Sequence, residues 1–200
     1  MRFRFLSLAL ALTAFTAFAV EPAKPKVTFT TSMGAFTVEL EPEAAPKTVA
    51  NFLGNVRSGH YKGTTFHRVI ANFMIQGGGV TAKGEEKPVK NSVENEAKLA
   101  MEKGLKNVRG SLAMARTSDP HSARAQFFVN VVDNAALDFP SRDGWGYCVF
   151  GKVVEGMETV DAIRNVKTGG ANKPLETVLI TDATVVGEKA PVKKAKSRKK

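Results

Sequence analysis

Short runs in which apolar and polar residues alternate recur along the chain, and they limit it to a mainly β fold. Residues 26–31 (KVTFTT) and 35–40 (AFTVEL) alternate on either side of a short link that contains Gly34, which predicts a β-hairpin. Similar β-rich runs occupy residues 64–70, 73–76, 110–115, 126–131, 147–153 and 178–186. Many short strands separated by turn signals predict an antiparallel barrel that closes on itself.

Two stretches follow the helical period instead. Residues 46–57 begin with proline and repeat apolar residues at helical spacing, at Val49, Phe52, Leu53 and Val56. Residues 157–165 show a similar spacing. We expect these two helices to plug the open ends of the barrel.

The polar segment 81–107, rich in Gly, Lys and Glu, is expected to form loops on the surface. No internal repeat divides the chain, so residues 27–187 are predicted to form one domain.

The first 19 residues have the features of a secretory signal peptide. Two arginines precede an apolar run that ends near Phe15, and the sequence AFA at 17–19 has small residues where a signal peptidase cuts. A membrane anchor is the alternative, but the apolar run is shorter than the roughly 20 residues that span a bilayer. We expect cleavage after about Ala19, export of the protein, and a linker over residues 20–26.

The formal net charge of +10 is concentrated at the ends of the chain. Residues 188–200 contain seven basic residues and one acidic residue, whereas residues 20–187 carry a net charge of only +2. The C-terminal stretch has no apolar periodicity, which predicts a disordered tail. Such a tail adds solubility or attaches weakly to an anionic membrane surface or polyanion. Because the body is nearly neutral, we expect no specific binding of nucleic acid.

Most templates for side-chain or metal chemistry are absent. Cys148 is the only cysteine, which excludes an internal disulfide and a zinc site built on paired cysteines. No two of the three histidines have helical i,i+3 or i,i+4 spacing, and no G-x-S-x-G elbow occurs. The phosphate-loop pattern that starts at Gly79 fails because Glu85 replaces its lysine. We therefore expect no metal and no cofactor.

Residues 66–78 (FHRVIANFMIQGG) combine an arginine with an apolar setting. On an alternating strand, Arg68 would share its face with Phe66 and Ile70. Taken alone, each phenylalanine is a core residue and each arginine a surface charge. Their combination is what points to a binding site.

Together with residues 114–116 (MAR), 126–130 (QFFVN) and 147–153 (YCVFGKV), this segment closely resembles the cyclophilin-type peptidyl-prolyl cis-trans isomerases. The likeness extends from about Lys26 to Val186 and is greatest to the bacterial exported branch, which implies a periplasmic location. It implies a closed eight-stranded antiparallel barrel capped by two α-helices. It further implies a monomer that isomerises Xaa-Pro bonds in unfolded or partly folded exported polypeptides and so assists their folding.

The resemblance also assigns roles to individual residues. Arg68 is implied to be the catalytic residue. The residues implied to bind substrate are Phe73, Met74, Phe128 and Leu137 in the proline pocket, Phe150 at its floor or rim, Gln76 bracing Arg68, and Ala115, Arg116, Gln126 and Tyr147 beside it.

Three positions depart from the family pattern. Many eukaryotic members carry tryptophan where this chain has Ala136, which argues against a strong cyclosporin site. Tyr147 stands where histidine is common and Arg116 where asparagine is common, and both should alter which peptides bind.

Isomerisation of an Xaa-Pro bond explains why nucleophile, base and metal are missing, because no covalent bond forms or breaks. A rival interpretation is a peptide-binding chaperone of the same fold. The presence of Arg68 argues against it, since binding alone needs no donor at the proline nitrogen. A weaker rival is a polyanion binder that acts through the basic tail.

Overall fold

A computed structural model describes residues 23–188. The predicted signal peptide over residues 1–19, and the predicted tail except for Glu188, lie outside the described residues. Eight strands form one sheet: β1 (Lys26–Thr31), β2 (Gly34–Leu40), β3 (Thr64–Ile70), β4 (Met74–Thr81), β5 (Ser111–Met114), β6 (Phe127–Asn130), β7 (Val149–Glu155) and β8 (Ile180–Val185).

The strands run in the order β3-β4-β6-β5-β7-β2-β1-β8, and every neighbouring pair is antiparallel. The two edge strands approach each other through a bridge between Thr65 and Leu179 and a 3.0 Å hydrogen bond from the Phe66 amide to the Val178 carbonyl. The predicted eight-stranded barrel is therefore confirmed, nearly closed where β3 meets β8.

Phenylalanine rings fill the interior of the barrel. Because side chains alternate across a strand, Val27 and Phe29 on β1 are fully buried while Thr28 between them is more exposed. The Phe29 ring lies 5.2 Å from Phe36 and 5.1 Å from Phe127, centroid to centroid. The packed aromatic rings support the strands of the barrel wall from the inside.

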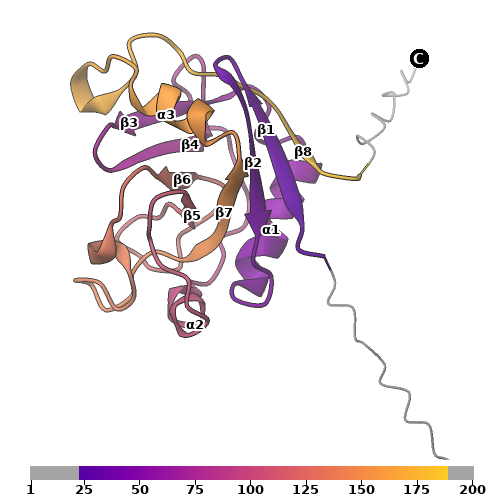
Figure 1. Ribbon diagram of the computed structural model, residues 1–200, viewed down its shortest axis with the longest axis vertical. Coiled ribbons are helices and arrows are strands. Elements are labelled where there is room, and N and C mark those ends of the chain that lie inside the picture. Colours follow the sequence, from indigo (N-terminus) through magenta and orange to yellow (C-terminus); the bar gives the residue numbers. More distant parts are fainter. Residues whose placement is uncertain (1–22, 189–200) are drawn as a thin grey trace, which may run out of the picture.

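The barrel carries three α-helices, α1 (Pro46–Arg57), α2 (Ala97–Glu102) and α3 (Met157–Arg164), and two short 3₁₀ turns, η1 (Ala135–Leu137) and η2 (Gly170–Asn172). Figure 1 shows α3 across the top of the barrel and α1 behind β1 and β2. Both helices bury apolar residues in the barrel core. The two helices predicted from periodicity are thus found. In the part of the chain that is described, no helix is long and apolar enough to cross a membrane.

The segment expected to form surface loops, residues 81–107, contains α2 as well. Ala97 and Ala100 of this short helix are buried against the core, as is the carboxylate of Glu96 just before it. The polar composition concealed the helix because only its two alanines face inward. Part of this segment is therefore core rather than loop.

Glu96 caps the start of α1 from about fifty positions along the chain. Its Oε1 accepts the Lys47 amide at 3.1 Å, and its Oε2 accepts both the amide and the hydroxyl of Thr48 at 2.8 Å. The residue before the helix, Ala45, has no side chain that could do this. A carboxylate at this end also complements the helix dipole.

Candidate active site

A β-bulge in β3 determines where Arg68 points. Phe66 lies opposite Gly77 and Arg68 lies opposite Gln76, so His67 is an extra residue on β3. The Phe66 side chain consequently points into the barrel core, and the Arg68 side chain points outward from the barrel wall. The expectation that Phe66 and Arg68 share a face is wrong, because the bulge interrupts the alternation of side chains between the two faces of β3.

The bulge aligns Arg68 with a row of residues across four strands. Gln76 on β4 is opposite Arg68, Phe128 on β6 is opposite Gln76, and Ala113 on β5 is opposite Phe128. Phe128 is 4% exposed and forms a small apolar cluster with Met74, Ala113 and Val149, separate from the barrel core. A cation and an apolar patch therefore lie side by side on the outer wall.

A chain of hydrogen bonds holds the Arg68 guanidinium. Arg68 Nη1 donates to Gln76 Oε1 at 3.2 Å, and Gln76 Nε2 donates to Gln126 Oε1 at 3.0 Å. Gln126 fits because residue 79 is a glycine, since a Cβ there would stand 2.2 Å from Gln126 Cγ. Gly79 is a requirement of the site that the sequence alone did not reveal.

These side chains enclose a recess of about 110 Å³. It is lined by Arg68, Phe73, Met74, Gln76, Ala115, Arg116, Phe128, Leu137 and Tyr147. Sites for drug-sized ligands occupy about 300 Å³ or more. The recess therefore admits one small ring or side chain, with a cation at its edge.

Gln126 lines a second recess, of about 370 Å³, which shares Gln76, Ala115 and Arg116 with the first. Its remaining lining is polar: Glu86, Thr117, Ser122 and Arg124. The structure thus brings together every predicted site residue except Phe150 in two adjoining recesses.

Phe150 is not at the floor or rim of the recess. Its ring is fully buried in the barrel core, 5.0 Å from that of Phe52. Val149 lies opposite Ala113 on the outer wall, so the next residue on β7 must point inward. The predicted pocket contact of Phe150 is therefore corrected to a core contact.

Arg116 is tied to the loop that follows η1. Its side chain is 3% exposed, its Nε and Nη2 donate to the Gly146 carbonyl at 3.2 and 3.0 Å, and Nη2 also pairs with Asp143. The guanidinium stands 4.4 Å over the ring of Tyr147. Hydrogen bonds from Arg116 and from two backbone amides lower the pKa of Asp143 to about 2. This cation shapes the rim of the recess and holds Tyr147.

A buried polar network that sequence reasoning missed positions the other side of the rim. Asp138 Oδ1 accepts the backbone and side-chain N–H groups of Asn107 at 2.7 and 2.9 Å. Asn107 in turn accepts from Asn130 at 3.1 Å, and the Tyr147 amide donates to the Leu137 carbonyl at 2.9 Å. The asparagines of this network, at positions 107 and 130, are isolated in the sequence, so no local pattern indicated that they are in contact.

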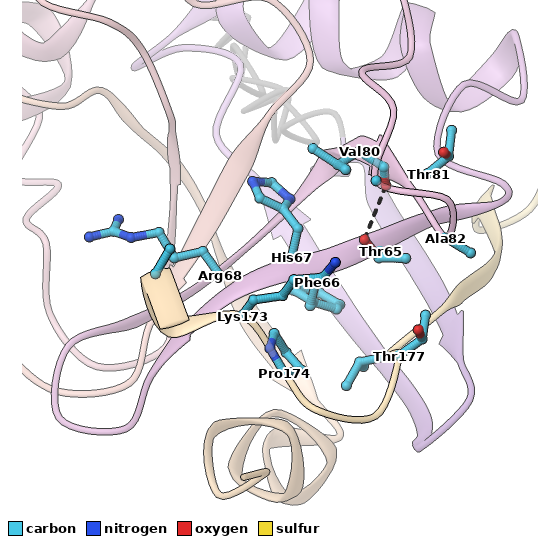
Figure 2. Close-up of a pocket in the computed structure, with 13 residues that line it drawn as sticks. Thr65, Phe66, His67, Arg68, Val80, Thr81, Ala82, Lys173, Pro174 and Thr177 are labelled. Carbon is cyan, nitrogen blue, oxygen red and sulfur yellow. Dashed lines mark hydrogen bonds between the residues drawn. The ribbon is translucent and has the colours of Figure 1, made fainter. Parts of the chain in front are cut away.

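A third pocket, of about 290 Å³, lies on the other side of β3, between that strand and the segment that includes Lys173 and Pro174. Figure 2 shows the Arg68 side chain pointing out of this pocket. Among residues 23–188, no three His, Cys, Asp or Glu side chains gather as metal ligands would.

A family model described as cyclophilin type peptidyl-prolyl cis-trans isomerase/CLD matches residues 26–185. The chain belongs to this family. It is 52% identical over 167 residues to peptidyl-prolyl cis-trans isomerase cyp18 of Streptomyces antibioticus, covering 80% of this chain and 98% of that protein. It is 51% identical over 165 residues to peptidyl-prolyl cis-trans isomerase B of Escherichia coli K12, again covering 80% and 98%. The cyclophilin chain is thus a peptidyl-prolyl cis-trans isomerase, as the sequence predicted.

Solved structures agree with the cyclophilin fold. A cyclophilin-type isomerase of Cryptosporidium parvum superposes with a TM-score of 0.68 at 28% identity, covering 83% of this chain and 99% of that one. A second structure of that protein was determined in the presence of the dipeptide Ala-Pro, with a TM-score of 0.67, 29% identity and coverage of 82% and 99%.

Proposed function

We propose that the recess beside Arg68 is where this isomerase turns Xaa-Pro bonds, with Arg68 as its catalytic residue. The observation that carries the proposal is the placement of a permanently charged guanidinium at the edge of an apolar recess, with one nitrogen held by Gln76. Phe73, Met74, Phe128 and Leu137 would hold the proline ring.

The chemistry requires a donor and nothing covalent. Rotation about the bond breaks amide resonance, at a cost of about 18–20 kcal/mol. In the twisted transition state the proline nitrogen regains a lone pair, which a guanidinium N–H directed at it can bond. The planar ground state offers no such lone pair, so the interaction stabilises the transition state selectively.

The required magnitude exceeds one hydrogen bond. Unaided isomerisation proceeds at about 0.01 per second, and reaching an enzymatic rate of about 10 per second requires about 4 kcal/mol. A hydrogen bond to a charged group contributes about 1.5–3 kcal/mol. The rest must come from fixing the ring in the recess while the preceding carbonyl rotates, and from excluding water.

Replacing Arg68 tests the proposal. Arg68→Ala should lower kcat/KM by about a hundredfold, the loss of one charged hydrogen bond, while circular dichroism and Tm stay near wild type because the side chain lies outside the core. Arg68→Lys keeps the charge but loses the planar guanidinium, so its kcat/KM should lie between those of wild type and Arg68→Ala. An NMR exchange measurement on a short Xaa-Pro peptide gives the rate. Wild-type activity in Arg68→Ala would remove Arg68 from the mechanism.

We further propose that the protein is exported, acts in the periplasm as a monomer, and assists the folding of other exported chains. The features of residues 1–19 support export, and the likeness to bacterial isomerases supports the setting. Its partners would be proline-containing polypeptides, in keeping with the Ala-Pro dipeptide used with the Cryptosporidium parvum relative. Cell fractionation and N-terminal sequencing test export, because a mature protein should begin after about Ala19.

A further inference from the structure

Asn134 lies in the segment between β6 and η1, and the isomerase mechanism leaves it without a role. It does not line the recess, yet it bonds to two residues that do. Its side-chain Nδ2 donates to the Phe73 carbonyl at 2.9 Å, and its own carbonyl accepts from the Leu137 amide at 2.9 Å. Within residues 23–188, no hydrogen bond other than that from Nδ2 joins the segment 134–138 to the turn that carries Phe73.

The local structure does not explain which way the Asn134 carboxamide points. Asn134 immediately precedes η1, a position where an asparagine oxygen commonly accepts an N–H from the first helical turn. Its side chain makes no such bond here. The reason for its orientation must therefore lie in other segments.

A chain of four hydrogen bonds fixes that orientation. A carboxylate only accepts, so Asn107 turns its NH₂ to Asp138, at 2.9 Å. Asn107 then presents Oδ1 to the NH₂ of Asn130 at 3.1 Å. Asn130 in turn presents Oδ1 to Asn134 Nδ2 at 2.7 Å. The second N–H of Asn134 is left for the Phe73 carbonyl.

Phe73 depends on this bond because it lies outside both neighbouring strands. β3 ends at Ile70 and β4 begins at Met74, so Phe73 belongs to the turn between them. Its carbonyl accepts from the Val131 amide at 3.2 Å and from Asn134 at 2.9 Å. Removing the shorter bond would leave the turn with more freedom, because few contacts hold it.

Leu137 is fixed at both ends of η1. At its start the Asn134 amide donates to the Asn107 carbonyl at 2.7 Å, and just after its end Asp138 accepts the Asn107 amide, also at 2.7 Å. The Tyr147 amide donates to the Leu137 carbonyl. Asn134 therefore joins a firmly held side of the recess to a side that lies in a turn.

We propose that Asn134 is a positioning residue that sets the spacing of Phe73 and Leu137 across the recess and so selects the five-membered ring of proline. The inference rests on the proposed role of the recess. The recess holds about 110 Å³, and one extra methylene in an apolar pocket changes rates by about 10- to 200-fold. If the Phe73 side can move outward, part of that discrimination is lost.

The experiment compares an Xaa-Pro peptide with its counterpart in which pipecolic acid, with one more ring methylene, replaces proline. NMR exchange at pH 8 gives kcat/KM for each peptide. Wild type should prefer the proline peptide by about tenfold or more. Asn134→Asp keeps the size of the side chain but replaces its NH₂ with an acceptor. Its kcat/KM for proline should fall about five- to tenfold, and its preference for proline by at least about threefold.

Asn134→Ala is the second variant, because it removes the two donors without adding a charge. It should shift the preference in the same direction. Thr64→Val is the control for lost stability. Thr64 is buried and lines neither recess, and its Oγ1 donates to the Tyr61 carbonyl at 2.6 Å. This variant should lower Tm and leave the preference at the wild-type value.

A double variant tests whether Asn134 acts through Phe73. In the Phe73→Ala background, Asn134→Asp should change the preference no further, because the ring whose position it controls is gone. A further loss of preference in that background would overturn the inference.

Phe128→Ala separates this inference from the proposed function. If it raises KM while both Asn134 variants keep the wild-type preference, the role of Asn134 is overturned and the recess stands as the site. If it leaves KM unchanged, the proposed function fails, and this inference with it. An equal fall in kcat/KM for both peptides in the Asn134 variants, or a wild type without preference, would also overturn the inference.

Discussion

Two arginines line the recess, and what binds them distinguishes their roles. Arg116 donates from all three of its nitrogens, to the carbonyls of Gly146 and Thr117 and to Asp143. Arg68 makes one hydrogen bond within the described residues, to Gln76, which leaves N–H donors available for a substrate. The sequence alone does not distinguish the two cations. Their hydrogen-bond partners in the structure show that the donors of Arg116 are already used within the protein.

Phe128 provides a test of the recess itself. Its ring is packed among Met74, Ala113 and Val149 and meets Tyr147 edge-on at 5.8 Å. Phe128→Ala should raise KM and lower kcat, together reducing kcat/KM by about 10- to 100-fold, because an apolar contact worth about 1.5–3 kcal/mol is lost. Steady-state kinetics on an Xaa-Pro peptide measures both constants. An unchanged KM would contradict the assignment of the recess to proline.

Ile70→Ala is the control for Phe128→Ala. Ile70 packs against the same cluster but does not line the recess. This substitution should lower Tm through lost packing while KM stays at the wild-type value. A comparable rise in KM would mean that the effect of Phe128→Ala reflects loosened packing rather than a lost contact with substrate.

At the scale of elements, the start of α1 depends on a residue from another segment. Glu96, next to α2, accepts three hydrogen bonds from Lys47 and Thr48 in the first turn of α1. Glu96→Gln should cost about 2 kcal/mol, because charge-assisted hydrogen bonds are lost and a buried N–H group is left without a partner. For a domain of this size the expected fall in Tm is about 4–8 °C, measurable by calorimetry.

Glu94→Gln is the matched control for Glu96→Gln. Glu94 pairs with Lys47 at the surface, with both side chains more than half exposed (58% and 61%). Exposed ion pairs contribute about 0–1 kcal/mol, so the fall in Tm should not exceed about 4 °C and should be smaller than that of Glu96→Gln. Equal losses in the two variants would show that Glu96 acts as an ordinary surface charge.

The features predicted from sequence are those that local patterns determine. The β1–β2 hairpin and α1 depend on residues close in the chain, and both were found, α1 with its predicted bounds. The bulge at His67 and the capping of α1 by Glu96 depend on contacts across strands or across some fifty positions. No periodicity reports such contacts, so the opposite facing of Phe66 and Arg68 and the cap from Glu96 were missed. The short helix α2 was missed for another reason, since only its two alanines are buried.

The same reasoning applies to the site. The residues around the recess were predicted from the resemblance to the cyclophilin family. A family motif identifies side chains that come together at one site even where they are distant in sequence. Phe150 was placed wrongly because it lies one position from Val149, and a single step along a strand changes the face. The requirement for Gly79 was missed because it concerns space taken by Gln126, a residue distant in sequence.

At the scale of the whole molecule, we expect charge and catalysis to be separate. The basic stretch 188–200 contributes more than half of the net charge of +10. Its first residue, Glu188, pairs with Arg57 of α1 at 2.7 Å, and neither residue lines the recess. The two parts should therefore be separable by deletion.

Removing residues 189–200 should leave isomerisation of a short peptide within about twofold of the full chain, because the recess keeps all its lining residues. The shortened chain should be retained less on heparin or on anionic vesicles than the full chain. Retention of the full chain should weaken as the salt concentration rises. Peptide kinetics and salt-gradient elution measure the two effects. A large loss of isomerisation would place the tail in the site.

The recess lies on the outside of a barrel wall whose four strands are joined by their own hydrogen bonds. With the proline bound there as proposed, a client would approach sideways: a proline in the middle of a long chain would dock without either end being threaded through the enzyme. No part of the wall has to swing open for the product to leave. Under the proposed function, such a catalyst would be suited to visiting many prolines in turn along a polypeptide that has not yet reached its final shape.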